Sequence, residues 1–467
     1  MTDYRTEKDT LGDVRVPANA LWGAQTQRAV ENYPISGLRE HPVFIRSFIY
    51  LKKAAALANK ELKGMDAKLA DAIISACDDL LKNESNYREQ FVVDVFQAGA
   101  GTSFNMNVNE VIANLANRVL GGKLGEYKPI NPNDHVNMAQ STNDVFPTAI
   151  RVATVLLLSE LIPEIEALAL AFEAKGREFA DVIKSGRTHL QDAVPVTLGQ
   201  EFKAYGVAIK RANGLLVTSA DELHELAIGG TATGTGINTP KGYRFAVVRH
   251  LNEMTGYNFK SMEDLREGMQ SQLAISATSG AYRNLALELT RITNDLRLLA
   301  SGPQTGLAEI ILPAVQPGSS IMPGKVNPSM LECMNQVLFH IIGSDTAIAY
   351  ATQAGQLELN VMMPLMAFEI LFSIEILKNF LPVFVEKCIR GIEADRKRCE
   401  AYYISSPSLA TALNPLIGYA RAAEIAKESA KSGKPIPQLL REKKLMSEEE
   451  IARIFTPEFL AGQADQV

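Results

Sequence analysis

The sequence predicts a mainly all-α protein organised around a central bundle of long helices. Apolar residues recur at spacings of three and four over long stretches, as between Val155 and Phe172. Alanine, leucine and isoleucine dominate these stretches, aromatic residues make up only 7% of the chain, and the strand signal is weak throughout. The long helical runs are expected at about 196–227, 264–300, 328–352 and 363–391.

Length and changes of character along the chain predict three domains. A chain of 467 residues is too long for one compact core. A turn-rich start followed by shorter helices predicts an N-terminal domain at 1–141, and the long apolar runs predict a central helix-bundle domain at 142–396. Short helices, one with the capping-box pattern Ser447 to Glu450, predict a small C-terminal helical domain at 397–467.

Composition excludes several classes of protein. The formal net charge of -6 and the pI of about 5.7 argue against a nucleic-acid-binding surface. Four widely spaced cysteines predict reduced thiols, and the polar N-terminus does not resemble a signal peptide. No apolar run is expected to span a bilayer, because Ser159 and Glu160 interrupt the strongest one. We therefore expect a cytoplasmic protein without nucleic-acid or membrane partners.

The segment from Gly318 to Asn327 is the strongest functional candidate. Two glycines hinge it, two prolines stiffen it, and between them it carries a hydroxyl, an amine and a carboxamide. Such a loop is suited to close over a small anion and to exclude water when substrate is bound. On composition alone, an ordinary helix–helix connection explains the same residues equally well.

Three further polar stretches, at 99–107, 137–144 and 186–192, each precede an apolar segment. Their hydroxyls and amides, with helix N-termini, are neutral donors that suit a bound carboxylate. For any one stretch, ordinary helix capping is the simpler explanation. No His-Glu-x-x-His or clustered Cys and His predicts a metal site. The glycine-rich run 229–236 lacks the Gly-Lys-Ser/Thr ending of a nucleotide loop, so we expect a tight turn there.

The run Gly-Ser-Ser-Ile-Met-Pro-Gly-Lys-Val-Asn-Pro at 318–328 resembles the signature loop of the fumarase/aspartase superfamily. The three polar stretches resemble the remaining signature regions of that superfamily, in the same order. The resemblance implies a three-domain fold, a small dicarboxylate substrate, no cofactor, and a homotetramer whose active sites are shared between subunits. Long apolar helix faces in one chain independently favour an oligomer.

The same resemblance implies roles for individual residues. It gives the general base to Ser319 and the binding of the α-carboxylate to Lys325 and Asn327. The residues that it implies for the β-carboxylate are Thr102, Ser141 and Thr142. The residues that it implies around the leaving amino group are Asn143, Thr188 and His189.

Within the superfamily the motifs are most similar to the aspartate ammonia-lyase branch. Thr102-Ser103 and Ser141-Thr142 stand where fumarases tend to have Thr-Gln and Ser-Ser. We therefore expect reversible deamination of L-aspartate to fumarate and ammonia, by anti elimination through an enediolate.

Two alternatives remain. The stretches 21–28 and 132–135 resemble class II fumarase, which hydrates fumarate to L-malate. Asn131 replaces the histidine of the fumarase pattern, and Met363 stands where a charged residue is expected. The other alternative is a non-catalytic helical oligomer, which the presence of the serine, the lysine and the hydroxyl clusters disfavours.

Overall fold

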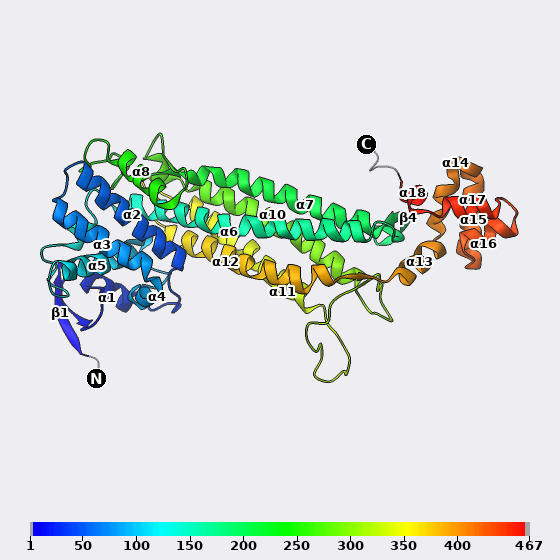
Figure 1. Ribbon diagram of the computed structural model, residues 1–467, viewed down its shortest axis with the longest axis horizontal. Coiled ribbons are helices and arrows are strands. Elements are labelled where there is room, and N and C mark those ends of the chain that lie inside the picture. Colours follow the sequence, from blue (N-terminus) through cyan, green and yellow to red (C-terminus); the bar gives the residue numbers. More distant parts are fainter. Residues whose placement is uncertain (1–2, 463–467) are drawn as a thin grey trace. The chain divides into compact units, whose positions relative to one another are not determined.

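The computed structural model describes residues 3–462 and is dominated by helices (Figure 1). Its strands form four two-stranded sheets, three antiparallel and one parallel. The all-α expectation is confirmed by the fumarase-like fold. The short hairpins escaped the sequence analysis because two-stranded pieces carry little alternation of apolar and polar residues.

The chain divides into two compact units, each formed by three separate stretches of sequence. The first unit contains 1–161, 215–284 and 340–376, and the second contains 162–214, 285–339 and 377–467. The unit boundaries fall inside long helices. The three-domain division at 141 and 396 therefore stays a prediction.

Elements of the first unit begin with a hairpin and a cluster of helices. They are β1 (Tyr4–Asp9), β2 (Gly12–Pro17), α1 (Ala24–Asn32), α2 (Pro42–Glu61), α3 (Ala67–Lys82), α4 (Glu84–Tyr87), α5 (Thr102–Val119), β5 (Glu225–Leu226), α8 (Tyr243–Thr255), β6 (Lys260–Ser261) and α9 (Glu267–Gln270). Short helical turns, of which that at Pro132–Val136 is a π-helix, complete this part.

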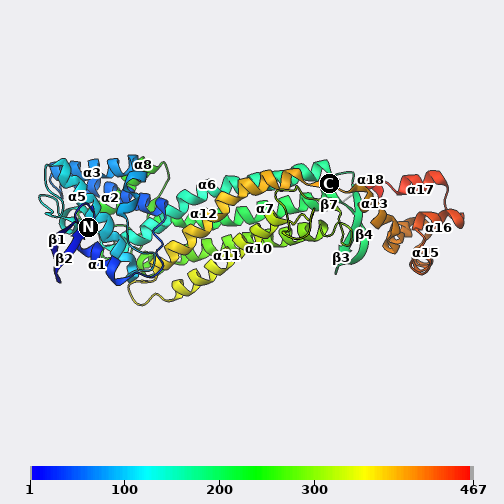
Figure 2. The ribbon, with the colours of Figure 1, turned by 90° about the horizontal axis from the view of Figure 1, so that it is seen from below.

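Five long helices run through the chain and lie side by side within each unit (Figures 1 and 2). They are α6 (Thr142–Glu178), α7 (Leu198–Ala220), α10 (Leu273–Leu299), α11 (Ser329–Gln353) and α12 (Met363–Lys387). In the first unit the Tyr282 hydroxyl of α10 donates to the carbonyl of Ser373 in α12 at 2.9 Å. In the second unit Asn335 of α11 donates to Asn294 of α10 at 2.9 Å.

The second unit also carries β3 (Ile183–Thr188) and β4 (Gln191–Thr197), which form an antiparallel hairpin, and β7 (Ile310–Ile311) with β8 (Glu393–Ala394). Its C-terminal helices are α13 (Arg396–Ser405), α14 (Asn414–Ile417), α15 (Tyr419–Ser432), α16 (Ile436–Glu442), α17 (Glu448–Ile454) and α18 (Pro457–Leu460). They enclose a small core of their own around Leu439 and Leu440. The predicted capping box between Ser447 and Glu450 is present.

Helix α6 is long and apolar enough to cross a membrane by length and composition, which the sequence analysis did not anticipate. However, 78% of its most apolar window is buried inside the structure. Packing against neighbouring helices therefore accounts for its apolar character, as in the core helix of a bundle. The helix begins at Thr142, and its start carries three of the predicted site residues, Ser141, Thr142 and Asn143.

Candidate active site

The predicted site residues fall into two groups, one in each unit. Thr102 and the run from Ser141 to Asn143 lie in the first unit, at the beginnings of α5 and α6. Thr188 and His189 lie at the tip of the β3–β4 hairpin of the second unit, and the 318–327 loop precedes α11 of the same unit. Among residues 3–462, no hydrogen bond or ion pair joins the hairpin tip to this loop.

Thr102 is the first residue of α5, and the turn before it requires glycine. Ala100 (φ 61°) and Gly101 (φ 80°) both adopt left-handed backbone conformations. A Cβ at Gly101 would lie 1.9 Å from the ring of Phe146, so a side chain there would collide with α6. The close approach brings the first turn of α5 against α6, while Thr102 itself stays exposed.

The N-cap residue Gly101 has no side chain to cap α5, and the side chain of Gln97 caps its first turn instead. Its side-chain oxygen accepts from the backbone N–H of Phe104 at 2.9 Å, and its amide nitrogen donates to Glu40 at 3.0 Å. Glu40 is buried, and its pKa lies well above the usual range because of burial and of the nearby charge of Asp94. The buried Glu40 side chain therefore positions Gln97, the residue that caps the helix beginning with Thr102.

The start of α6 is fixed by the buried carboxylate of Asp144. One oxygen accepts from the backbone N–H of Ser141 at 2.9 Å. The other accepts from the N–H groups of Gly229 at 2.9 Å and Thr231 at 3.0 Å. Burial raises the pKa of Asp144 to about 6, and the three N–H donors act in the opposite direction. This one side chain ties the 141–143 run to the glycine-rich loop.

Hydrogen bonds from within the unit leave two hydroxyl protons free to donate. The Ser141 oxygen accepts from the backbone N–H of Asn143 at 3.2 Å. The Thr142 oxygen accepts from the side-chain nitrogen of Asn105 at 3.0 Å. Neither hydroxyl donates to another group among residues 3–462, so each O–H remains available to an anion. Two adjacent donors of this kind suit one carboxylate.

Asn143 offers a hydrogen-bond acceptor, whereas Ser141 and Thr142 offer donors. Its side-chain nitrogen donates to the carbonyl oxygen of Ala232 at 2.8 Å. With that amide orientation, its side-chain oxygen is the atom that remains available, and this atom is an acceptor. Such a group suits a positively charged amine, in contrast to the hydroxyls of Ser141 and Thr142.

Beneath this run lies a buried ammonium group, Lys52 of α2. Its nitrogen donates at 3.0 Å to both the Asn137 and the Gln140 side-chain oxygens. Burial lowers the pKa of Lys52 to about 7, and the negative charge of Asp144 opposes that shift. The Asn137 oxygen also accepts from Asn105, so this network reaches the partner of Thr142.

In the second unit, His189 is presented on a strained turn. His189 (φ 56°) and Leu190 (φ 57°) occupy the two central positions of the hairpin, and both are left-handed. Hairpins with this turn normally use Asn-Gly or a similar pair, because side chains disfavour positive φ. Thr188, His189 and Leu190 are all exposed, and no side-chain partner of His189 is found among residues 3–462.

The base of the hairpin is anchored by buried charges. Glu309 is fully buried and holds Arg187 through two hydrogen bonds of 2.9 Å each. Lys184 lies 3.3 Å from both Glu309 and Glu201. Removing one member of such a buried set leaves an uncompensated charge. The cluster therefore fixes the strand that leads into His189.

Ser319 accepts hydrogen bonds in its loop. Its hydroxyl oxygen accepts from the backbone N–H groups of Ile321 at 3.2 Å and Met322 at 2.9 Å. Two N–H groups converging on one oxygen stabilise negative charge on that oxygen. Ser319 is half-buried, whereas its neighbour Ser320 is exposed.

The ends of this loop are joined at Gly318. Its N–H donates to the carbonyl of Lys325 at 2.8 Å, and its own carbonyl accepts from the Asn327 side chain at 2.5 Å. A Cβ at Gly318 would lie 2.5 Å from the Lys325 carbonyl oxygen, so only glycine fits. Asn327 thus closes the loop with its amide nitrogen. The Lys325 side chain is exposed, and residues 3–462 provide no ion-pair partner for it.

Several residues that position this site were not predicted as functional: Lys52, Gln97, Asn105 and Glu309. Lys52 had a usable signal, because it interrupts the apolar face of the helix that begins at Pro42. Glu309 had none, because Arg187 is distant from it in sequence. Gln97 had none, because only the left-handed turn at Ala100 and Gly101 brings its side chain to Phe104. Asn131, the departure from the fumarase pattern, caps the 132–136 turn by accepting from Asn133 and Asp134.

Between residues 3 and 462, no group of three or more His, Cys, Asp or Glu side chains is arranged to hold a metal ion. The four cysteines are free thiols, of which Cys77, Cys388 and Cys399 are buried. The predicted site residues themselves offer hydroxyls, amides, the Lys325 amine and the His189 imidazole. They suit binding of a small anion and transfer of a proton.

Comparison with known proteins gives the family. The lyase family profile matches residues 12–343, and the fumarase C C-terminus profile matches residues 409–462. Aspartate ammonia-lyase of Bacillus subtilis is 46% identical, covering 97% of this chain and 95% of its own. Aspartate ammonia-lyase of Escherichia coli is also 46% identical, covering 99% of this chain and 97% of its own.

Solved structures agree with these sequence matches. A fumarate lyase:delta crystallin structure from Brucella melitensis bound to cobalt has a TM-score of 0.95 and 46% identity, covering 99% of this chain and 100% of that chain. A class II fumarase from Schistosoma mansoni has a TM-score of 0.93 and 34% identity, covering 98% and 99%. The chain belongs to the fumarase/aspartase superfamily. It is an enzyme, and within the superfamily it is a carbon–nitrogen lyase.

Replacing Lys52 should change how stability depends on pH. The pKa of Lys52 is lowered to about 7 from 10.5, so between these values the folded protein binds fewer protons here than the unfolded chain. Burying the ammonium therefore costs stability below about pH 7, and this cost fades as the pH rises to 10.5. From pH 7 to 10, wild type should gain up to about 1.4 kcal/mol per pH unit relative to Lys52→Met.

Denaturant unfolding at several pH values measures this difference. Lys53→Met is the matched control, because Lys53 is the next residue and pairs with the exposed carboxylate of Asp78. Parallel stability curves for wild type and Lys52→Met would contradict a buried, titrating ammonium.

Proposed function

We propose that the enzyme converts L-aspartate reversibly to fumarate and ammonia. The observation that carries this proposal is the opposite hydrogen-bond polarity of the serine and threonine hydroxyls. Ser141 and Thr142 keep their protons free to donate, whereas Ser319 receives two N–H donors on its oxygen. Close similarity to aspartate ammonia-lyases over nearly the whole chain supports L-aspartate as the substrate.

In this mechanism the β-carboxylate is bound by Thr102, Ser141 and Thr142. Removal of a Cβ proton leaves an electron pair that moves into the carboxylate and forms an enediolate dianion. The Ser141 and Thr142 hydroxyls strengthen their hydrogen bonds as that charge develops, which lowers the barrier. Return of the electron pair forms the Cα–Cβ double bond and expels the amine from the opposite face.

Ser319 is the proposed base. A serine hydroxyl is too basic to act alone at neutral pH. The N–H groups of Ile321 and Met322 stabilise its anion, and Lys325 adds a positive charge when the loop covers the substrate. Lys325 and Asn327 are the proposed ligands of the α-carboxylate. The Asn327 amide nitrogen donates one N–H to the Gly318 carbonyl, and its second N–H is available to the carboxylate.

Around the leaving amine we propose Asn143, Thr188 and His189. The free side-chain oxygen of Asn143 is an acceptor for the substrate ammonium. His189 is exposed on its turn and has both ring nitrogens available for orienting the amine. The reaction needs no redox step, so the proposal includes no cofactor.

We also propose a cytoplasmic homotetramer in which subunits share active sites. The two groups of site residues belong to different compact units, and the helices expose large apolar side chains such as Leu287, Phe339 and Tyr350. Apolar helix faces of this kind are covered in symmetric oligomers. Small dicarboxylates are the proposed substrates, without nucleic-acid or membrane partners.

The test of the reaction is fumarate absorbance with ammonia assayed in parallel. Purified enzyme should release fumarate and ammonia in equal amounts from L-aspartate, and should release no fumarate from L-malate. Fumarate from L-malate alone would favour class II fumarase and overturn the proposal. Inactivity with both substrates would also contradict it.

Replacing Ser319 with alanine should lower kcat by about 10²–10⁴-fold, because proton abstraction loses its base. Ser320→Ala is the matched control, because it removes the neighbouring hydroxyl, which is exposed. Steady-state kinetics with L-aspartate measure both variants. A Ser319→Ala enzyme that retains wild-type turnover would exclude this residue as the base.

A further inference from the structure

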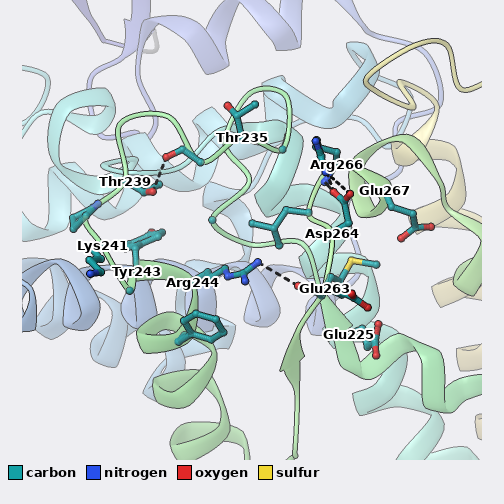
Figure 3. Close-up of a pocket in the computed structure, with 18 residues that line it drawn as sticks. Glu225, Thr235, Thr239, Lys241, Tyr243, Arg244, Glu263, Asp264, Arg266 and Glu267 are labelled. Atoms are coloured by element: carbon teal, nitrogen blue, oxygen red, sulfur yellow. Dashed lines mark hydrogen bonds and ion pairs between the residues drawn. The ribbon is translucent and has the colours of Figure 1, made fainter.

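A cavity of about 990 Å³ in the first unit contains none of the predicted site residues. Its walls are the glycine-rich loop, the start of α8 and the segment 262–267 (Figure 3). Its volume lies in the range typical of small-molecule sites. The proposed reaction does not use it.

The wall of this cavity depends on glycine. Gly229 (φ +94°) would place a Cβ 2.7 Å from the Cβ of Arg244, and Gly234 (φ +84°) would place one 2.5 Å from the Cα of Arg266. The loop therefore lies directly against both arginines, and no larger residue fits at either position. The glycine backbone therefore packs closely against the first atoms of Arg244 and Arg266.

The Arg244 side chain is held in place by two contacts, but no carboxylate neutralises its charge. Its guanidinium lies 4.6 Å from the ring centroid of Phe245 and donates to the Met262 carbonyl at 3.3 Å. No carboxylate in the part of the chain from 3 to 462 forms an ion pair with it, nor with Lys241, a second cation of the same wall. Figure 3 shows Lys241 and Arg244 on the same side of the cavity. Their remaining N–H groups are free for a ligand anion.

Carboxylates line another part of the cavity. Glu263 has no ion pair among residues 3–462. Glu225 and Glu267 both lie close enough to the buried guanidinium of Arg151 to interact with it electrostatically. Asp264 and Arg266 pair only with each other. The cavity is therefore lined by the cations of Arg244 and Lys241 and by the carboxylate of Glu263, which form no ion pair with one another. A small molecule with an ammonium and a carboxylate could bridge them.

The cavity wall is joined directly to the candidate active site. Asp144 accepts from Gly229 and Thr231, and Asn143 donates to Ala232, so both hold the glycine-rich loop. A ligand that shifts this loop would also shift the start of α6. That helix start carries Ser141 and Thr142.

We propose that this cavity is a second ligand site for a small zwitterion, with its carboxylate toward Arg244 and Lys241 and its ammonium toward Glu263. Occupancy then alters the geometry of the 141–143 run through the glycine-rich loop. Binding does not depend on the reaction proposed above, whereas the effect on turnover rests on it.

Titration calorimetry with the full enzyme tests binding. The probes are glycine, 4-aminobutyrate and 6-aminohexanoate, which carry both charges at increasing separation, with butyrate and butylammonium as single-charge controls. At least one zwitterion should bind saturably and the controls should not. Absence of binding by all three zwitterions, or equal binding of a single-charge control, would overturn the proposal.

Variants locate the bound probe. Arg244→Met and Glu263→Gln should each weaken binding by about tenfold or more, equivalent to about 1.4 kcal/mol. Arg249→Met is the matched control on α8, because Arg249 pairs with Glu61 and Glu253 outside the cavity. Lys325→Ala should leave binding intact. Loss of binding in Lys325→Ala, with retention in Arg244→Met, would place the probe in the active site and refute the second site.

Kinetics test the coupling separately. With the bound zwitterion saturating, KM or kcat for L-aspartate should change in wild type and not in Arg244→Met. Binding without any kinetic change would refute the coupling while leaving the site. An enzyme that does not act on L-aspartate would refute the proposed reaction, and calorimetry would still decide the site.

Discussion

The arrangement of the first unit's site depends on the buried carboxylate of Asp144. It accepts three backbone N–H groups, from Ser141 and from two residues of the glycine-rich loop, and thereby joins the start of α6 to a segment far along the chain. A carboxylate can serve three such donors because both of its oxygens are acceptors. Burial disfavours its charge, whereas the donors and the nearby Lys52 favour it. The site is therefore held by a charged group that the fold keeps away from water.

Around that anchor, chemically similar side chains differ in hydrogen-bond polarity, and the proposed mechanism gives them different roles. Asn105 and the Asn143 N–H occupy the oxygens of Thr142 and Ser141, so these hydroxyls can act as donors. Ser319 has the reverse arrangement, since two N–H groups point at its oxygen. Three hydroxyls of the same kind can thus bind an anion in one place and become anionic in another.

The sequence predicted much of this arrangement but not its supports. Long helices such as α11 and α12 follow from apolar periodicity, and the loop around Ser319 follows from its glycines and from family resemblance. Gln97 and Glu309 could not be predicted, because their roles arise from partners brought near by tertiary packing. The strained turn at His189 was equally hidden, since its residues give no turn signal.

The most direct test of this account is the steady-state rate of Asp144→Asn with L-aspartate. The substitution keeps the size of the side chain but turns one acceptor into a donor that faces backbone N–H groups. We expect kcat to fall by about 100-fold, because the 141–143 run loses its position. Asp134→Asn, at an exposed position, should remain at the wild-type rate. If Asp144→Asn also retains wild-type kcat and KM, the Asp144 carboxylate does not position the site and the account is contradicted.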